Sequence, residues 1–465
     1  MTPDLFSTLP LAPAQLEALE GLGYSAMTPV QAQSLPAILQ RKDVIIQAKT
    51  GSGKTAAFGI GLLHHLNPRF FGVQALVMCP TRELAEQVGE AIRQLASRMR
   101  NIKVVMLCGG KPFGPQRDSL EHGAHIVVGT PGRIQDHLQR QTLDLTSVAT
   151  FVLDEADRML DMGFAEVMAT ITAALPEKRQ TLLLSATFPD DIKKMSRAIQ
   201  HQPIEVKVDT VLTHDETVVE QLFFEIQKHE RNTALLALFE HYQPGNAMVF
   251  CNTKKQCAEV AAFLQEHDIE AAAIHGDLDQ RDRDQVLLQF TNNTSPVLVA
   301  SDVAARGLDI PALAMVVNFE LPRDGDTYVH RIGRTGRAGE TGQAFSLVTP
   351  SESPRLRVIE DHLQINCLCD VLESLNRNPN YQLQGDMTTL QFDAGRKQKL
   401  RPGDILGALT GDAGLAGDQI GKIKILDNSS YVAIARPVLR QAMNYLAQGK
   451  IKGRSIRVRR LKLHR

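Results

Sequence analysis

The sequence predicts an α/β protein built from two parallel α/β domains in tandem and a small C-terminal α+β domain. Apolar runs of strand length recur between residues 43 and 350, and most of them are continuous rather than alternating. Continuous apolar strands are typical of a sheet that helices cover on both faces. Segments of helical period lie between the runs, for example 82–99 and 256–267. Strands that alternate with helices in this way favour parallel sheets.

Each of the first two domains is marked by its own set of strand-like runs. The first set is DVIIQA (43–48), QALVMC (74–79), KVVMLC (103–108), HIVVG (125–129), FVLD (151–154) and TLLLSAT (181–187). The second set is NAMVFC (246–251), AAAIHG (271–276), PVLVASD (296–302), MVVNFE (315–320) and QAFSLV (343–348). The run of strands is interrupted around 203–230 by acidic, linker-like sequence, so we place a boundary near residue 210. We expect a first domain over residues 1–208 and a second over residues 218–372.

A third domain is expected after the polar stretch 374–386. Its segments read strand, helix, strand, strand, helix, strand: TTLQFDA (388–394), PGDILGALTG (402–411), IGKIKIL (420–426), SYVAIA (430–435), PVLRQAMNYLAQ (437–448) and RSIRVRRL (454–461). This βαββαβ order predicts a compact domain over residues 387–465.

Composition excludes several classes of protein. The 465 residues are 43% hydrophobic and 22% charged, the balance of an ordinary globular protein. No apolar stretch approaches the roughly 20 residues that span a bilayer, and the N-terminus lacks the basic and apolar regions of a signal peptide. Four of the six cysteines lie in or near apolar runs, and the remaining pair, Cys367 and Cys369, is too closely spaced for a usual zinc half-site. We therefore expect a cytoplasmic protein with no membrane partner and no structural metal.

The net charge of −1 conceals a strong asymmetry along the chain. Residues 396–465 carry 16 Lys and Arg against 4 Asp and Glu, whereas the residues before them carry 35 against 48. A cationic segment on an otherwise acidic body predicts an appendage that binds nucleic acid. The alternative is a solvated basic tail without a target.

A phosphate-binding loop is predicted at AKTGSGKT (48–55), which lies between a strand and a helix. It fits GxxxxGK[ST] except that Ala48 replaces the first glycine. Backbone N–H groups of such a loop approach phosphate oxygens at a helix N-terminus, while Lys54 would reach the β- and γ-phosphates and Thr55 would bind Mg²⁺. The alternative is a glycine-rich turn with a solvated lysine. The nucleotide-binding residues expected here are Gly51, Ser52, Gly53, Lys54 and Thr55.

The acidic segment VLDEADRML (152–160) ends another predicted strand. In open parallel sheets ligands bind beyond the carboxyl ends of the strands, so Asp154 is placed to hold nucleotide-bound Mg²⁺ and Glu155 to orient or deprotonate the attacking water. We expect Asp157 to bond to a neighbouring motif instead of touching metal. The alternative for the whole segment is an acidic helix N-terminus.

HRIGRTGR (330–337) is the arginine-rich segment of the second domain. Arg334 and Arg337 are candidates for arginine fingers on the γ-phosphate if the two domains close face to face. An arginine-rich, solvated helix is the alternative.

Eight motifs, in this order, together resemble the DEAD-box RNA helicases over about residues 1–365. They are AKTGSGKT, PTREL (80–84), TPGR (130–133), DEAD (154–157), SAT (185–187), VFCNT (249–253), ASDVAARGLD (300–309) and HRIGRTGR. Upstream, Phe6 and GYSAMTPVQ (23–31) resemble the adenine-sensing Q motif of that family. The resemblance implies two RecA-like domains, ATP and Mg²⁺ as cofactors, RNA-dependent ATP hydrolysis and local unwinding of RNA.

The resemblance also implies a role for each matching residue. Gln31 would read the adenine edge with Phe6 packing nearby, and Asp309 would touch the ribose. Hydrolysis would be coupled to domain closure by Asp157, Ser185, Thr187 and His330. In the first domain, RNA backbone contacts would come from Pro80, Thr81, Arg82, Gly109, Gly110, Thr130, Gly132 and Arg133. In the second domain they would come from Thr253, Gly276, Gln280, Arg283, Ser301, Asp302 and Arg306; Ser301 stands where the family usually has threonine.

The C-terminal domain resembles an RNA-recognition motif (RRM), with Phe392 and Tyr431 where a standard motif has several stacking aromatics. KLRPGDILGALTG (399–411), IGKI (420–423) and GKIKG (449–453) resemble the DbpA subgroup of bacterial DEAD-box proteins. The resemblance implies that this domain binds a 23S rRNA hairpin, in the helix 92 region, during large ribosomal subunit assembly. Candidate contacts are Lys397, Lys399, Arg401, Lys422, Lys452, Arg454, Arg457 and Arg459.

Alternatives remain at the level of function. The same motifs would serve a DNA helicase or translocating motor with the same two-domain core, although the Q motif and the DEAD sequence disfavour it. They would also serve an ATP-gated RNA clamp or assembly scaffold that uses hydrolysis only for release. The sequence leaves both a monomer and a homodimer open.

Overall fold

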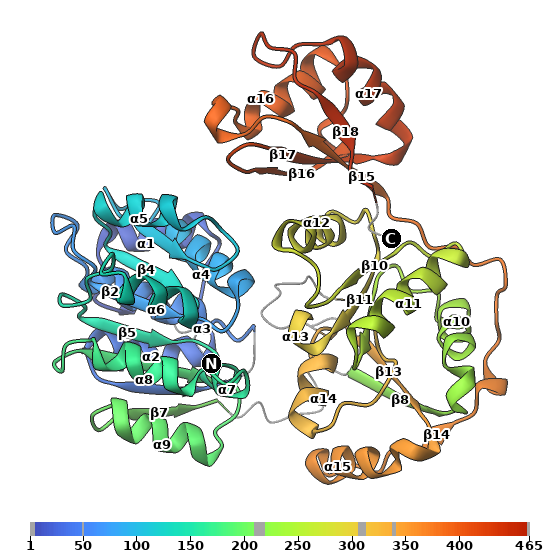
Figure 1. Cartoon of the computed structure of the whole chain (residues 1–465), viewed down its shortest axis with the longest axis horizontal. Helices are drawn as coiled ribbons and strands as arrows, with labels where there is room; N and C mark the ends of the chain where they lie inside the picture. The colour runs from blue at the N-terminus through green and yellow to red at the C-terminus, as the bar shows by residue number, and fades with distance from the viewer. Residues whose placement is uncertain (1–4, 49–50, 209–218, 306–312, 337–340, 463–465) are drawn as a thin grey trace. The chain divides into compact units, whose positions relative to one another are not determined.

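A computed structural model describes residues 5–48, 51–208, 219–305, 313–336 and 341–462 (Figure 1). The described residues divide into two compact units, of which the first ends at residue 208 and the second begins at residue 219. The expected boundary near residue 210 lies outside the described residues.

The first unit is built on a seven-stranded parallel sheet in the order β3-β4-β2-β5-β6-β1-β7. The strands are β1 (Val44–Gln47), β2 (Ala75–Met78), β3 (Val104–Leu107), β4 (Ile126–Gly129), β5 (Thr150–Leu153), β6 (Gln180–Ser185) and β7 (Ile204–Lys207). Leu182 of β6 pairs with Val44 of β1 on one side and with Val152 of β5 on the other, so a single strand separates the phosphate-loop strand β1 from β5. The motifs that follow β5, β6 and β1 therefore lie on three adjacent strands of the sheet.

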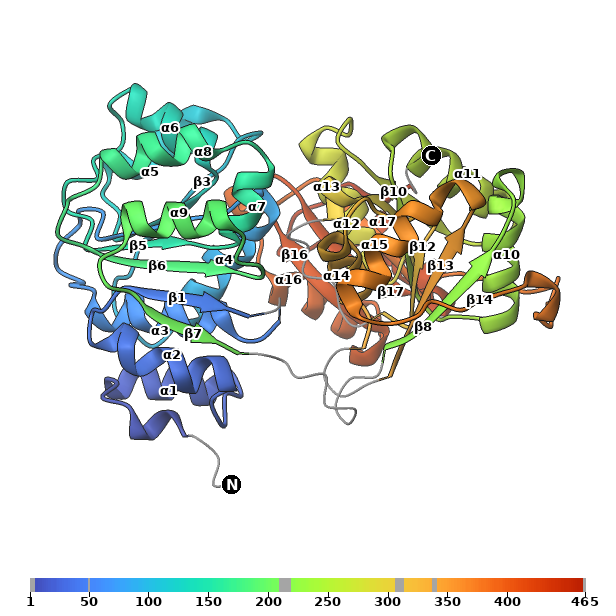
Figure 2. The same ribbon diagram turned by 90° about the horizontal axis from the view of Figure 1, so that it is seen from below.

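Helices cover both faces of this sheet, as the continuous apolar runs predict (Figure 2). Alternate strand residues divide between two apolar clusters, so that Ile46 belongs to one and Ile45 to the other. Helices α1 to α4 pack in the first cluster and α5 to α9 in the second. The helices are α1 (Pro13–Gly21), α2 (Pro29–Leu39), α3 (Lys54–His65), α4 (Arg82–Leu95), α5 (Phe113–Glu121), α6 (Pro131–Gln139), α7 (Ala156–Asp161), α8 (Ala165–Ala173) and α9 (Asp190–Ile199).

The second unit contains a second seven-stranded parallel sheet, in the order β10-β11-β9-β12-β13-β8-β14. Its strands are β8 (Val219–Glu225), β9 (Ala247–Cys251), β10 (Ala271–Ile274), β11 (Val297–Ser301), β12 (Met315–Asn318), β13 (Gly342–Val348) and β14 (Cys369–Asp370). Its helices are α10 (Arg231–Tyr242), α11 (Lys254–Glu266), α12 (Gln280–Thr291), α13 (Asp302–Ala305), α14 (Gly325–Ile332) and α15 (Ser353–Leu363). The expected interruption of the strands around 203–230 is wrong, because both β7 and β8 fall within it.

The C-terminal residues of the second unit form a four-stranded antiparallel sheet in the order β16-β17-β15-β18. Its elements are β15 (Met387–Phe392), α16 (Pro402–Gly407), β16 (Ile420–Ile425), β17 (Ser430–Ala435), α17 (Leu439–Gln448) and β18 (Val458–Arg460). This is the predicted βαββαβ order. Leu390 and Phe392 pack with the two helices, so these alternate side chains of β15 define the core face of the sheet.

Hydrogen bonds within the second unit attach this small sheet to the larger one. Thr389, on the face of β15 away from the helices, is fully buried, and its Oγ1 lies 3.2 Å from Asn292 Nδ2 and 2.8 Å from Thr294 Oγ1. Gln289, near the end of α12, donates from Nε2 to the carbonyl oxygen of Lys462 at 2.8 Å. Buried polar side chains that bond across the contact fix its register.

Three further features of the described residues concern membrane spans, metal sites and disulfides. None of their helices is both long and apolar enough to cross a membrane. Over the same residues, no cluster of three or more His, Cys, Asp and Glu side chains is arranged to hold a metal ion. All six cysteines are free thiols, and only Cys369 is exposed.

Candidate nucleotide and RNA sites

The described part of the predicted phosphate loop, residues 51–55, follows β1 and leads into α3. Gly53 is the residue before α3 and has φ 93°, a left-handed conformation that favours glycine. A Cβ added at Gly53 would lie 2.6 Å from Nε2 of Gln31, so glycine is also required for space. Thr28 Oγ1 donates to the carbonyl oxygen of Ser52 at 2.8 Å, and Gln31 Nε2 donates to that of Gly53 at 3.2 Å. The start of α2 therefore holds the loop in place.

The residues of this loop fit a phosphate group. The side-chain oxygen of Ser52 is buried without a hydrogen-bond partner among the described atoms. Lys54 is 8% exposed, its ammonium donates to the carbonyl oxygen of Ala48, and burial lowers its pKa. An orphaned hydroxyl and a poorly compensated cation in one loop are both stabilised by an anion.

The first two carboxylates of the DEAD motif, Asp154 and Glu155, directly follow β5 as predicted. Asp154 is 3% exposed, and its burial, with the charge of Glu155 as the next cause, raises its pKa to about 7. Glu155 has φ 52°, a strained backbone conformation for a side chain other than glycine. A buried carboxylate with a second carboxylate beside it fits a cation, because a cation removes the electrostatic cost. The donor set of Asp154 and the Thr55 hydroxyl is of the oxygen type that Mg²⁺ takes.

Asp157 joins the DEAD motif to the SAT motif. Its Oδ2 accepts the backbone N–H of Ala186 at 3.2 Å and both the N–H and the hydroxyl of Thr187 at 3.0 Å. Ser185 Oγ donates to the carbonyl oxygen of Thr187 at 2.5 Å. The side chain of Asp157 thus bonds across to a neighbouring motif, as its sequence position suggests, and the two motifs form one hydrogen-bonded unit.

The expected adenine residues lie close to the loop but are not equally accessible. Phe6 is 4% exposed, and its ring meets that of Tyr24 edge to face at 6.1 Å. Tyr24 is 38% exposed and lies within the Q-motif segment, so it is the more accessible aromatic of the pair, which the sequence interpretation missed. Gln31 is 1% exposed, and its Oε1 accepts the N–H of Thr28 at 2.9 Å. Reading of adenine by Gln31 stays a prediction.

The expected RNA contacts of the first domain gather at the carboxyl ends of β2, β3 and β4. Thr81 caps α4 by accepting the N–H of Leu84 at 3.2 Å. The guanidinium of Arg82 lies against Gly109, where an added Cβ would be 3.0 Å from Nη2. Arg133 Nη1 donates to the carbonyl oxygen of Lys111 at 3.0 Å. Pro80, Gly110, Thr130 and Gly132 complete this rim.

The second domain presents its expected contacts at the corresponding ends of β9, β10 and β11. Thr253 caps α11 by accepting the N–H of Gln256 at 3.3 Å, and Gln280 Nε2 donates to Asp284 at 2.9 Å. Arg283 lies on α12, Ser301 ends β11, and Gly276 has open space around its Cα. Arg306 lies outside the described residues, as do Asp309 and Arg337.

Arg331 is a central residue that the sequence interpretation missed, although it lies inside HRIGRTGR. It is 1% exposed and donates to both carboxylate oxygens of Asp302, at 2.7 and 2.8 Å. It also donates to side-chain oxygens of Asn318 at 3.1 Å and Asn252 at 2.9 Å, and to the carbonyl oxygen of Glu320 at 2.7 Å. The carboxylate of Asp302, expected to contact RNA, is engaged in this pair.

The two candidate site residues of that motif that the structure describes, His330 and Arg334, lie on either side of Arg331 in the chain. His330 belongs to α14, and Arg334, just beyond its end, is 7% exposed. The backbone N–H of Arg334 donates to the carbonyl oxygen of Arg331 at 3.2 Å. The assignment of His330 to coupling and of Arg334 to the γ-phosphate stays a prediction.

The C-terminal sheet does not offer its two aromatic positions to RNA, but its candidate cations are accessible. Phe392 is fully buried in the core and Tyr431 is 5% exposed, so neither ring is available to stack on a base. The candidate cations are all exposed: Lys397, Lys399, Arg401, Lys422, Lys452, Arg454, Arg457 and Arg459.

Two loops of the C-terminal domain bring five of these cations together. Lys452 Nζ donates to the carbonyl oxygen of Lys399 at 3.2 Å, and Arg454 Nη1 donates to that of Gln398 at 3.5 Å. We call residues 396–401 and 450–454 the paired basic loops. Lys422 lies on β16 and Arg459 on β18, the two outer strands of the sheet, so these two lie on opposite edges of the domain.

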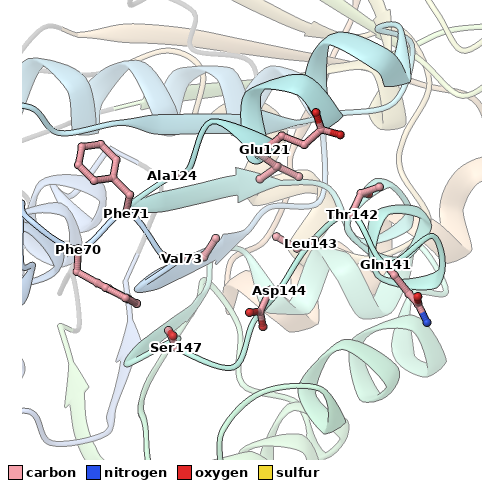
Figure 3. A pocket seen from close by; sticks show the side chains of 12 residues that line it. Phe70, Phe71, Val73, Glu121, Ala124, Gln141, Thr142, Leu143, Asp144 and Ser147 are labelled. Atoms are coloured by element: carbon pink, nitrogen blue, oxygen red, sulfur yellow. The ribbon is translucent and has the colours of Figure 1, made fainter.

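One cavity of the described residues lies away from both candidate sites. It has a volume of about 350 Å³ and lies in the first unit between the loops that precede β2, β4 and β5 (Figure 3). Phe70, Leu143 and Asp144 are among its lining residues. In a parallel sheet the amino ends of the strands share one edge, so this cavity is at the edge away from the phosphate loop.

Comparisons with known proteins match this geometry. Three family models match: DEAD/DEAH box helicase over residues 28–195, helicase conserved C-terminal domain over 230–339, and DbpA RNA binding domain over 389–460. The chain is 51% identical over 458 residues to an ATP-dependent RNA helicase DbpA of Escherichia coli (strain K12), covering 98% of this chain and 99% of that protein. It is 38% identical over 465 residues to a protein of the same name in Bacillus subtilis (strain 168), covering 95% and 96%. Among solved structures, Saccharomyces cerevisiae Dbp5 bound to RNA and ADP BeF3 is similar with a TM-score of 0.73 and 30% identity, covering 80% of this chain and 96% of that one.

Proposed function

The chain belongs to the DEAD-box ATP-dependent RNA helicases of the DbpA group, and from this membership we propose how its residues use ATP and which RNA it acts on. It is an RNA-dependent ATPase with two RecA-like domains and an RNA-binding C-terminal domain.

In the proposed site, the loop from Gly51 to Thr55 binds the phosphates of ATP, and Lys54 neutralises their charge. Asp154 and Thr55 hold Mg²⁺, which supplies charge neutralisation when bound. Glu155 orients the attacking water. Asp157 transmits the state of this centre to Ser185 and Thr187, because its carboxylate already bonds to that motif. Arg334, Arg337 and His330 complete the centre from the second domain.

For the RNA, we propose that the rims of both RecA-like domains hold the backbone and that the C-terminal domain selects a 23S rRNA hairpin during large-subunit assembly. Contacts to the backbone give affinity with little sequence preference, so selection has to come from the appended domain. The observation that supports this is the pairing of the basic loops, since the aromatic positions of the sheet are buried. Such a role would place the protein in the cytoplasm, as a monomer or a homodimer.

The test is steady-state ATP hydrolysis at one fixed salt concentration, without RNA and with poly(A), a plasmid duplex or 23S rRNA. Salt is fixed because phosphate contacts make binding salt-dependent. We expect the strongest stimulation by 23S rRNA, and we expect Lys399→Glu with Arg454→Glu to remove that preference. Arg440→Glu, an exposed charge reversal on α17, is the matched control and keeps it. Equal stimulation by every RNA would reduce the C-terminal domain to a general basic anchor.

A further inference from the structure

Arg133, expected to contact RNA, is held by three groups within the first domain. Its Nη1 donates to the carbonyl oxygen of Lys111, its Nε lies 3.7 Å from a carboxylate oxygen of Asp136, and its Cζ lies 5.8 Å from the centre of the Phe113 ring. The Arg133 side chain is 15% exposed as a result. A long, flexible side chain is thereby restricted to one region of the rim.

The Phe113 ring is itself fixed in place. It stacks on the ring of His137 with centroids 4.1 Å apart and an interplanar angle of 15°. Arg140 Cζ lies 4.5 Å from the same centroid, and its Nε donates to Asp136 at 2.7 Å. Phe113 begins α5, whereas His137 and both arginines belong to α6 or its end. The ring therefore joins the two helices beside the RNA rim.

The carbonyl group of Lys111, which accepts from Arg133, is held by a side chain of α5. Gln116, 7% exposed, donates from Nε2 to the carbonyl oxygens of Cys108 at 3.0 Å, Lys111 at 3.4 Å and Pro112 at 3.3 Å. This segment contains Gly109 and Gly110, which belong to the expected RNA contacts. Thus α5 fixes both the ring and the carbonyl oxygen that Arg133 contacts.

We infer that Phe113 is a positioning residue for RNA binding, which keeps the Arg133 guanidinium aimed at the RNA backbone by a cation–π contact. A guanidinium over an aromatic face is attracted by the ring quadrupole without losing any of its hydrogen-bond donors. Arg133 can then keep the ring contact while its free N–H groups bind a phosphate oxygen. The inference rests on the proposed role of Arg133.

The experiment is a double-mutant cycle on the full chain. The readouts are the RNA concentration that gives half-maximal ATPase stimulation, its dependence on salt, and the maximal rate. We expect Phe113→Leu to raise the half-saturating concentration about two- to fivefold, the size of one exposed cation–π contact, with an unchanged maximal rate. Arg133→Ala should reduce the slope of log affinity against log salt by about 0.7, the effect of one contact to single-stranded phosphate. Phe113→Leu should add nothing to the effect of Arg133→Ala.

Two controls separate positioning from general packing. Phe70→Leu changes an exposed ring near the cavity of the same domain and should leave RNA affinity unchanged. Phe113→Tyr keeps an aromatic face and should restore the affinity. If Arg133→Ala leaves the salt slope unchanged, the proposed role of Arg133 is wrong. If Arg133→Ala weakens binding but Phe113→Leu does not, or if the two effects add, the inference about Phe113 is wrong while that role stands.

Discussion

Lys54 of the first unit and Arg331 of the second are both buried cations, but their surroundings differ. Arg331 uses its five N–H donors in five hydrogen bonds, and its charge is paired with Asp302. Lys54 has three donors, of which one bonds to the carbonyl oxygen of Ala48 among the described atoms, and burial lowers its pKa despite three nearby carboxylates. A cation whose bonds are complete supports the fold, whereas one left incomplete is suited to bind a ligand.

The largest effect is expected when the complete network is broken. Arg331→Met leaves Asp302 as a partly buried, uncompensated charge and Asn318 as a buried acceptor without its donor. Breaking a buried pair in this way should cost about 3–5 kcal/mol of unfolding free energy. Urea unfolding, followed together with hydrogen exchange of the second unit, measures the loss.

Arg355 provides the matched control for that variant. Its side chain is 37% exposed and lies 3.7 Å from the buried carboxylate of Glu352, which keeps a second cation in Arg231, so Arg355→Met should cost no more than about 1 kcal/mol. Equal losses for the two variants would contradict the contrast between a buried cation with a complete network and a partly exposed cation whose partner keeps a second ion pair.

The second effect concerns activity and not stability. Lys54→Met removes the charge expected to meet the phosphates, and the loss of one preorganised electrostatic group should lower ATP hydrolysis by about 10²–10³-fold. The unfolding free energy should stay the same or rise, because a poorly compensated buried charge is removed. Steady-state hydrolysis and urea unfolding of the same preparation test both statements. A destabilisation as large as that of Arg331→Met would show that Lys54 is structural.

Much of the fold and the position of the candidate nucleotide site could be predicted from the sequence. The apolar runs gave the two parallel sheets and the order of the C-terminal elements, because strand length and continuity depend on local composition. The site at the ends of β1 and β5 followed from the phosphate loop and the DEAD segment, since both come directly after strands. The domain boundaries and the individual ligand contacts stay predictions.

The role of Arg331 and the burial of Tyr431 could not be predicted in this way. The partners of Arg331 come from four separate positions along the chain, which only the folded sheet brings together. Tyr431 pairs with Gln391 on the sheet face that does not pack on the helices, where alternation predicts exposure. Thr389 on the same face is covered through its bonds to Asn292 and Thr294. No local sequence pattern predicts that residues distant in the chain will bury this face of the sheet.

A third, smaller effect is expected at Asp157, whose carboxylate joins the DEAD motif to the SAT motif. Asp157→Asn keeps the size of the side chain but replaces an acceptor by a donor next to the N–H groups of Ala186 and Thr187. The unpaired groups should cost about 1–3 kcal/mol and reduce the stimulation of hydrolysis by RNA. Asp161→Asn, a change on the same helix, is the control. If RNA stimulation survives Asp157→Asn unchanged, coupling through this carboxylate is wrong.

The smallest effect involves His137. Like Lys54 it is buried, but it avoids the cost of a buried charge because its imidazole remains neutral. His137 is fully buried, its Nδ1 lies 2.8 Å from Thr142 Oγ1, and burial together with the charges of Arg133 and Arg140 lowers its pKa from 6.5 to about 4. The folded state therefore binds a proton less readily than the unfolded chain, so the stability that this group contributes is complete above pH 6.5 and is lost as the pH falls from 6.5 to 4.

His137→Asn tests this because its amide does not titrate, and its oxygen can accept from Thr142 in place of Nδ1. Urea unfolding of both proteins at a series of pH values gives the difference in unfolding free energy, in which the contributions of other titrating groups largely cancel. That difference should be constant above pH 6.5 and should change in favour of the variant between pH 6.5 and 4, by at most about 1.4 kcal/mol per pH unit, the slope for one proton. A difference that is flat through this range would mean that His137 keeps its ordinary pKa in the fold. In that case burial would not be what keeps His137 neutral in the folded protein.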